Sequence, residues 1–126
     1  MRIRDLAESW GAFERTDGNL LDPSILTDLA RAATRFYAGY AVLVEHIDAD
    51  PIPEITGDTE LTLSEWAIIR PLFLLYVERE TALQLEASRG MGLDVFGRSV
   101  SEIAQEITAM EAELPHRAFV REIESV

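Results

Sequence analysis

The sequence predicts an all-α protein, a small bundle of three to four helices with an extended C-terminal arm. Apolar residues recur at helical spacing in several long segments, and two of these segments begin with a capping-box sequence. The third observation is that ten of the twelve residues Trp66–Val77 are apolar. A helix that is apolar all round must be covered all round, either at the centre of the bundle or partly by neighbouring copies.

The composition predicts one folded domain. The chain has 126 residues, of which 48% are hydrophobic, and this is typical of a globular protein rather than a disordered one. We expect a helical domain over residues 1–115 and a docking arm over residues 116–126.

The first half of the chain contains two candidate helices. Asp5–Phe13 has apolar residues at helical spacing, and the sequence Asp17–Asn19 breaks the pattern. Asp22 is a suitable N-cap for a second helix, with Pro23 at its first position. Apolar residues continue on one face from there, so the helix should run from about Pro23 to His46.

The connector Asp48–Glu60 has neither helix nor strand periodicity. Thr62 and Glu65 then form a capping box, which predicts a helix that Gly90 ends as a left-handed cap. Pro71 lies inside this helix. It predicts either a kink near residues 67–71 or two helices that meet near Arg70.

A second capping box, Ser99 with Glu102, begins the last predicted helix. Its apolar face runs to Leu114, and Pro115 should end it. The segment that follows, His116–Val126, then has apolar side chains with no partner helix left in the chain. We therefore expect it to dock on another protein, through Arg117, Phe119, Val120, Arg121, Ile123 and Val126.

The formal net charge of −12 argues against binding to nucleic acid or to an anionic membrane, since both attract cations. An acidic surface could still line a channel through which DNA passes, because repulsion between the acids and the phosphates prevents the DNA from binding. All eleven cations are arginines, which either reflects paired interface contacts or a GC-rich genome. There is no cysteine, no signal-peptide core and no apolar stretch long enough to span a bilayer.

Few residues are candidates for catalysis or for metal binding. Glu78 and Glu80 lie in the apolar helix, and we expect them to pair with arginines inside the bundle or across a subunit interface, since buried carboxylates need partners. His46 and His116 match no metal-binding spacing and are interpreted as surface or capping residues. No phosphate-binding loop is present, so no metal, cofactor or catalytic residue is predicted.

The last predicted helix carries acids without a cation, and Glu102, Glu106 and Glu113 share one stripe. Like charges at this spacing weaken an isolated helix. The stripe is either a solvated face or a surface directed at DNA that must not bind, or at a basic partner.

From Leu61 onward the chain resembles phage head-to-tail adaptor, or head completion (connector), proteins. The residues that carry the resemblance are LTLSEWAIIRPLFLLYVERETALQLEASRGMG, GRSVSEIAQEI and ELPHRAFVREI. The resemblance implies an all-helical virion protein that forms a homo-oligomeric ring of twelve below the portal protein. It also implies a C-terminal arm at His116–Val126, a preceding helix at Ser99–Leu114, and a channel through which DNA passes without specific binding.

We therefore expect a structural protein, not an enzyme, that is made in the host cytoplasm and located in the neck of the virion. Its partners would be other copies of itself, the portal and a downstream tail or neck protein. Glu102, Glu106 and Glu113 would face the channel. One rival is a small acidic inhibitor that mimics DNA, and another is a helical-bundle enzyme with convergent carboxylates.

Overall fold

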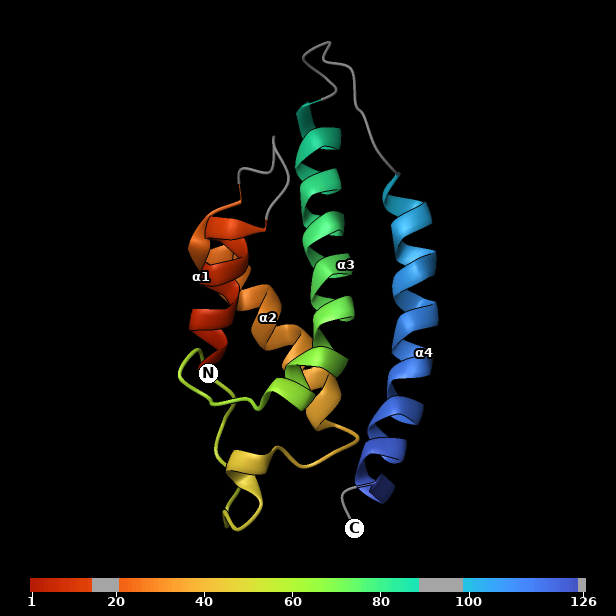
Figure 1. Cartoon of the computed structure of the whole chain (residues 1–126). Coiled ribbons are helices and arrows are strands. Elements are labelled where there is room, and N and C mark those ends of the chain that lie inside the picture. Colours follow the sequence, from red (N-terminus) through yellow and green to blue (C-terminus); the bar gives the residue numbers. More distant parts are fainter. Residues whose placement is uncertain (15–20, 89–98, 125–126) are drawn as a thin grey trace.

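The computed structural model describes residues 1–14, 21–88 and 99–124, without the side chains of Ser88 and of residues 118–124. Four α-helices follow one another in these parts of the chain, and a short 3-10 helix lies between the second and the third (Figure 1). Their bounds are α1 Ile3–Phe13, α2 Pro23–Ala38, η1 Val44–His46, α3 Leu63–Ser88 and α4 Val100–Glu124. The predicted all-α bundle is confirmed.

Helix α1 begins two residues earlier than predicted because a distant segment supplies its cap. The first N–H groups of a helix have no partner within the helix. Here the N–H of Ile3 donates to the carbonyl of Thr59 at 3.0 Å, and the N–H of Arg4 donates to the carbonyl of Gly57 at 2.9 Å. The end of the connector therefore serves as the N-terminal cap of α1.

Helix α2 ends at Ala38, so the prediction that it runs to His46 was wrong. Gly39 follows it, and glycine is a poor residue for a helix interior. Beyond the glycine, burial alternates along the chain: Ala41 and Leu43 are buried, whereas Tyr40 and Val42 are exposed. The apolar residues that extended the predicted helix belong to an irregular segment instead.

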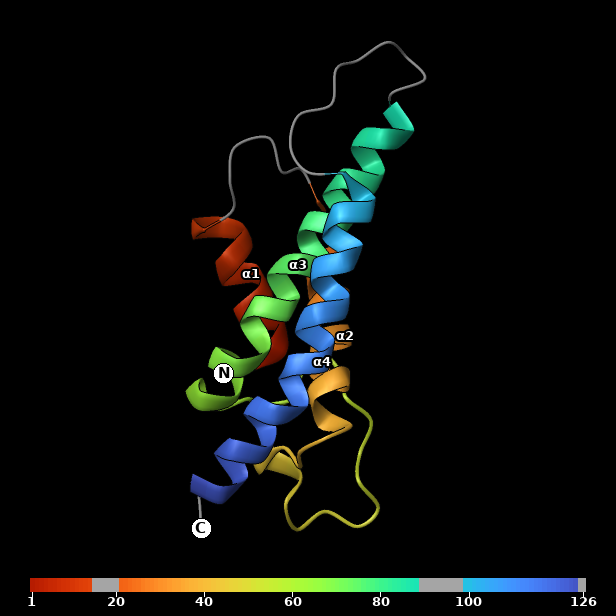
Figure 2. The ribbon, with the colours of Figure 1, turned by 90° about the vertical axis from the view of Figure 1, so that its right-hand side faces the viewer.

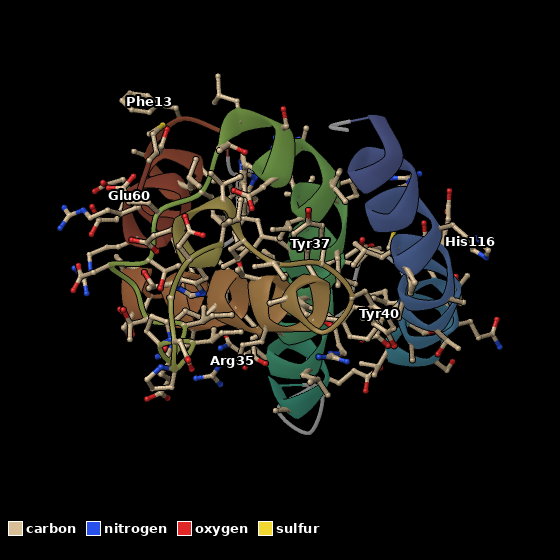
Figure 3. All side chains as sticks on the ribbon, turned by 90° about the horizontal axis from the view of Figure 1, so that it is seen from below. Phe13, Arg35, Tyr37, Tyr40, Glu60 and His116 are labelled. Atoms are coloured by element: carbon tan, nitrogen blue, oxygen red, sulfur yellow. The ribbon has the colours of Figure 1, made fainter. Side chains whose placement is uncertain are left out.

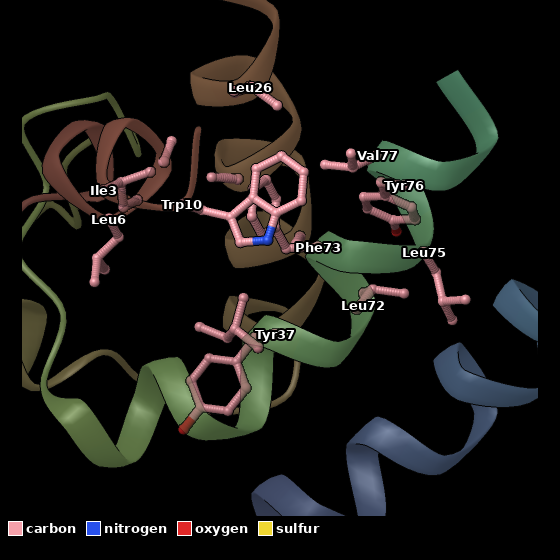
Figure 4. Close-up of a cluster of buried hydrophobic side chains, with 14 of the residues drawn as sticks. Ile3, Leu6, Trp10, Leu26, Tyr37, Leu72, Phe73, Leu75, Tyr76 and Val77 are labelled. Atoms are coloured by element: carbon pink, nitrogen blue, oxygen red, sulfur yellow. The ribbon is translucent and has the colours of Figure 1, made fainter. Parts of the chain in front are cut away.

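Helix α3 is the central helix of the bundle. It contacts both α2 and α4, and Ile69, Leu72 and Phe73 are completely buried. The ring of Trp10 packs against that of Phe73, with centroids 5.7 Å apart (Figure 4). The ring of Trp66 also packs against Phe73, with centroids 5.4 Å apart. Much of the predicted cover around this helix is thus provided within one chain.

Pro71 lies inside α3 and does not divide it into two helices. In Figures 1 and 2 the first turns of α3 lie at an angle to the remainder of the helix. A proline produces such a bend because it lacks an N–H group and its ring displaces the preceding turn.

Helix α4 runs antiparallel to α3 and packs against it through Ile103, Ile107 and Leu114 (Figure 2). The helix does not end at Pro115, as the sequence had predicted, but continues through it to Glu124. Packing against α3 on the preceding turns holds the axis, so the loss of one backbone hydrogen bond is tolerated. Residues 116–124 are therefore helical and not an extended arm.

Candidate functional site

The most distinctive surface of the molecule is a group of exposed apolar side chains between α2 and α3. We call this group the connector patch. Each of its members is 45–63% exposed, and the members are Tyr40, Val42, Val44, Ile47 and Ile52. Single exposed apolar side chains are common on monomeric proteins, whereas several that form one contiguous patch are typical of a binding surface. The sequence analysis missed the patch because it placed residues 40–46 in a helix that continues from Pro23.

Glu65 holds the connector patch against the start of α3. Its side chain is completely buried. One carboxylate oxygen accepts the N–H of Val44 at 3.0 Å, and the other accepts the N–H of Thr62 at 2.9 Å. The hydroxyl of Thr62 accepts the N–H of Glu65 at 3.1 Å in return. The predicted capping box is confirmed, and it also carries a bond to the connector that the sequence did not reveal.

Glu45 ties the two ends of the connector together. Its carboxylate accepts the N–H of Glu60 at 3.0 Å and lies 3.5 Å from Nε2 of His46. His46 is buried, with 4% of the residue exposed, so its interpretation as a surface residue was wrong. His46 is thus buried, whereas Val44 and Ile47 on either side of it are exposed. His116 is exposed and points away from the bundle (Figure 3).

An open cavity of about 290 Å³ lies beside these carboxylates. Its lining consists of Val44, Glu45, Glu60, Leu61, Thr62 and Glu65. The carboxylates of Glu45 and Glu65 are occupied by backbone N–H groups, and Glu60 lies 3.2 Å from the amino group of Met1. Within the described residues no group of three or more acids and histidines is placed to hold a metal ion. The carboxylates here therefore organise the backbone.

A second cavity, also of about 290 Å³, lies between α1 and α2 and contains Arg4 and Arg31. Arg4 pairs with Asp58, and Arg31 lies 3.4 Å from Asp28. Glu8 adds a further negative charge to the lining. Each arginine thus has one acidic partner, but Nε of Arg31 is buried and has no hydrogen-bond partner among the described residues.

The acidic stripe on α4 faces outward. Glu102, Glu106 and Glu113 are all exposed. The sequence predicted that this helix carries no cation. That prediction was wrong, because α4 is longer than expected and includes Arg117. The Arg117 guanidinium lies 2.9 Å from the Glu113 carboxylate. Whether the stripe faces a channel stays a prediction.

Glu111 does not belong to this stripe, since it contacts α3. The hydroxyl of Tyr76 donates to its carboxylate at 2.8 Å. The guanidinium of Arg79 lies over the Tyr76 ring, 5.0 Å from its centroid. Burial and the neighbouring carboxylate raise the pKa of Tyr76 well above its usual value of 10.0. This contact holds α3 and α4 in register.

The remaining predicted residues are only partly placed. Glu78 and Glu80 are half-buried on α3, and their pairing with arginines, inside the bundle or across a subunit interface, stays a prediction. Arg117 is exposed on α4. The side chains of Phe119, Val120, Arg121 and Ile123 lie outside the described residues, as does Val126. Their role in docking is therefore untested.

Comparison with known proteins does not extend these observations: no protein-family model, curated protein or solved structure matches the chain. Within the part of the chain that the structure describes, none of the helices combines the length and the apolar character needed to cross a bilayer.

Proposed function

We propose that this protein is a structural subunit of a phage virion, joining the head to the tail as one copy in a homo-oligomeric ring. The observation that carries the proposal is the connector patch, which presents five large apolar side chains to solvent. Such a surface suits a protein partner rather than a small polar substrate. The identity of the assembly comes from the resemblance of Leu61–Ile123 to head-to-tail adaptors.

Several properties of the chain support this role. A subunit beside a DNA channel must not retain DNA, and the net charge of −12 and the outward-facing Glu102 and Glu106 favour repulsion. The central helix is covered largely within one chain, so a copy could fold before it assembles. In this proposal the protein works without catalysis, and the portal and a tail protein lie on either side of the ring.

The test is to remove the gene from the phage genome and to supply the protein from a plasmid. Without the protein we expect filled heads and free tails that remain unjoined, as seen by electron microscopy. Native mass spectrometry with and without purified portal should show a ring, or a ring that forms only with the portal. Normal joined virions in the absence of the protein would refute the proposal.

The second candidate is an acidic inhibitor that mimics DNA, which the exposed stripe on α4 favours. It would act as a monomer or dimer and would bind a nucleic-acid-binding protein in competition with DNA. Mutation of Glu102 and Glu106 to glutamine should then abolish the inhibition. The same substitutions should leave virion assembly intact if the protein is a structural subunit.

A further inference from the structure

We propose that the connector patch binds a segment of another protein in which basic side chains stand among apolar ones. The inference rests on the proposed function, which takes the patch as a surface for a protein partner, and it adds the chemistry of that partner. Three features of the described residues lead to it: the patch is held in place by the fold, the unpaired charges beside it are negative, and an acidic cavity adjoins it.

The patch is ordered before a partner arrives. The buried carboxylate of Glu65 accepts the N–H of Val44 at 3.0 Å, and Leu43 anchors the segment because its side chain is buried. Ile47 and Ile52 nevertheless stay 61% and 63% exposed. A surface that is already ordered loses little conformational entropy on binding, so a short segment of a partner can bind to it.

The unpaired charges beside the patch are negative. The segment from residue 40 to residue 60 contains six acids and neither arginine nor lysine. Four of the six have partners: Glu45 accepts the N–H of Glu60, and ion pairs join Glu54 to Arg35, Asp58 to Arg4 and Glu60 to the amino group of Met1. The other two, Asp48 and Asp50, are exposed, and within the described parts of the chain neither side chain has an ion pair or a hydrogen bond. They lie between Ile47 and Ile52 in the sequence.

These charges determine which partner can cover the patch. A partner that covers the two isoleucines also removes water from the two aspartates, and a carboxylate that loses water without gaining a cation or a donor costs free energy. A segment that carries arginine or lysine beside its apolar residues offsets this cost. The same patch of a second copy would place acids against acids. Residues 118–126 of a second copy are also unsuitable, because they contain two glutamates and a single arginine.

The cavity of about 290 Å³ beside the patch provides a place for one such basic side chain. Val44 belongs both to the patch and to the lining of the cavity, so the two are continuous. Val44 and Leu61 offer apolar contacts for the stem of a long side chain. Glu45 and Glu60 each use only Oε2 in the contacts described above, and Oε1 of each has no hydrogen bond among the described residues. The charged end of an arginine or a lysine can donate to these oxygens.

The test uses the full chain and three fluorescent peptides of equal length. The first combines leucines at helical spacing with arginines, the second has glutamate in place of every arginine, and the third has serine in place of every leucine. Binding is measured by fluorescence polarisation at about 0.15 M salt, where exposed charges more than about 8 Å apart are largely screened. We expect the leucine–arginine peptide to bind at least about tenfold more tightly than either of the other two.

Matched variants show whether the charges beside the patch select the peptide. Asp48→Asn combined with Asp50→Asn should weaken binding of the leucine–arginine peptide about three- to tenfold, as expected for two exposed ion pairs. The control combines Asp22→Asn with Glu102→Gln, which removes the same charge elsewhere and keeps side chains that can still cap their helices. It should weaken binding less than about twofold.

A second pair of variants tests the apolar part of the patch. Ile47→Ser combined with Ile52→Ser should weaken binding about tenfold or more. Leu83→Ser combined with Leu85→Ser is the control, since both leucines are exposed near the C-terminal end of α3, and Figure 1 places that end opposite the connector. If Ile47→Ser lowers the melting temperature, Ile52→Ser alone is compared with Leu83→Ser alone.

Each other outcome overturns the inference. Equal binding of the glutamate peptide would show that charge does not select the partner, and equal losses in patch and control variants would show only a general attraction to an acidic protein. Self-association that disappears in the isoleucine variant would show that a second copy covers the patch. Removal of the gene gives an independent answer. Selective peptide binding together with normally joined virions in the absence of the protein refutes the proposed function alone, and unjoined heads and tails without selective binding refute this inference alone.

Discussion

Glu65 gives the sharpest prediction about stability. Replacing it by alanine removes the acceptors of two backbone donors, the N–H of Val44 at 3.0 Å and that of Thr62 at 2.9 Å. A hydrogen bond to a charged group contributes about 1.5–3 kcal/mol, and a buried donor left without a partner costs about 1–3 kcal/mol. Both donors are only partly buried, so water can reach them after relaxation. We therefore expect Glu65→Ala to lower the free energy of unfolding by about 3–4 kcal/mol.

Glu65→Gln separates the two bonds, because glutamine keeps one acceptor oxygen and places an NH₂ group against the other donor. The expected loss is about half as large, roughly 1.5–2 kcal/mol. Glu102→Ala is the matched control, since Glu102 occupies the same position of the second capping box but is exposed. It should cost no more than about 0.5 kcal/mol.

The measurement is urea unfolding monitored by far-UV circular dichroism, with hydrogen exchange at the Val44 amide. A domain of this size has a total stability of about 5–15 kcal/mol, so a loss of 3–4 kcal/mol is readily resolved. The reasoning is refuted if Glu65→Ala costs no more than Glu102→Ala, or if the Val44 amide exchanges equally slowly in both variants.

Four further predictions concern other parts of the chain. Deleting Ala118–Val126 should leave the melting temperature nearly unchanged and abolish incorporation into virions; unfolding of the truncated protein would show that the segment belongs to the core. Duplex DNA should show no mobility shift at low salt, and a salt-sensitive shift at micromolar protein would contradict the proposal. Because the pKa of Tyr76 is raised in the folded state, its contribution to stability is complete below the usual value of 10.0 and falls at higher pH. Tyr76→Phe should therefore flatten the decline above pH 10, measured by urea unfolding at several pH values. If Glu78 or Glu80 forms a buried ion pair with an arginine, its replacement by alanine should cost about 3 kcal/mol or more, and a cost within the surface range for both would refute the pairing.

The sequence predicted the elements whose cause is local. The capping box of Thr62 and Glu65 involves residues three apart, and it appears as expected at the start of α3. The apolar run that follows it predicted a helix buried on most of its sides, and the neighbouring helices of the bundle bury much of it. The start of α1 was displaced because its cap comes from Gly57 and Thr59, which no local pattern could reveal.

The errors share one physical origin, which is that tertiary packing overrode local propensity. Pro115 lies just after Leu114, which is completely buried, and α4 continues through the proline. The segment after Gly39 has apolar residues that also fit a helix, but Leu43 turns inward and Tyr40 remains outside. Tyr40, Val42 and Val44 of the connector patch lay within that predicted helix, so most of the candidate site could not be found before the fold was known.

The same carboxylate joins the folding of the core to the presentation of the patch. Glu65 caps the central helix through Thr62 and fixes the connector through Val44, so the patch can form only when α3 has begun correctly. Loss of Glu65 should therefore disturb the patch as well as stability, and assembly defects in that variant would not identify the contact surface. Ile47 is a better probe, because its side chain is 61% exposed and is not part of the core. A change at Ile47 that alters association and leaves the melting temperature unchanged would separate the interface from the fold.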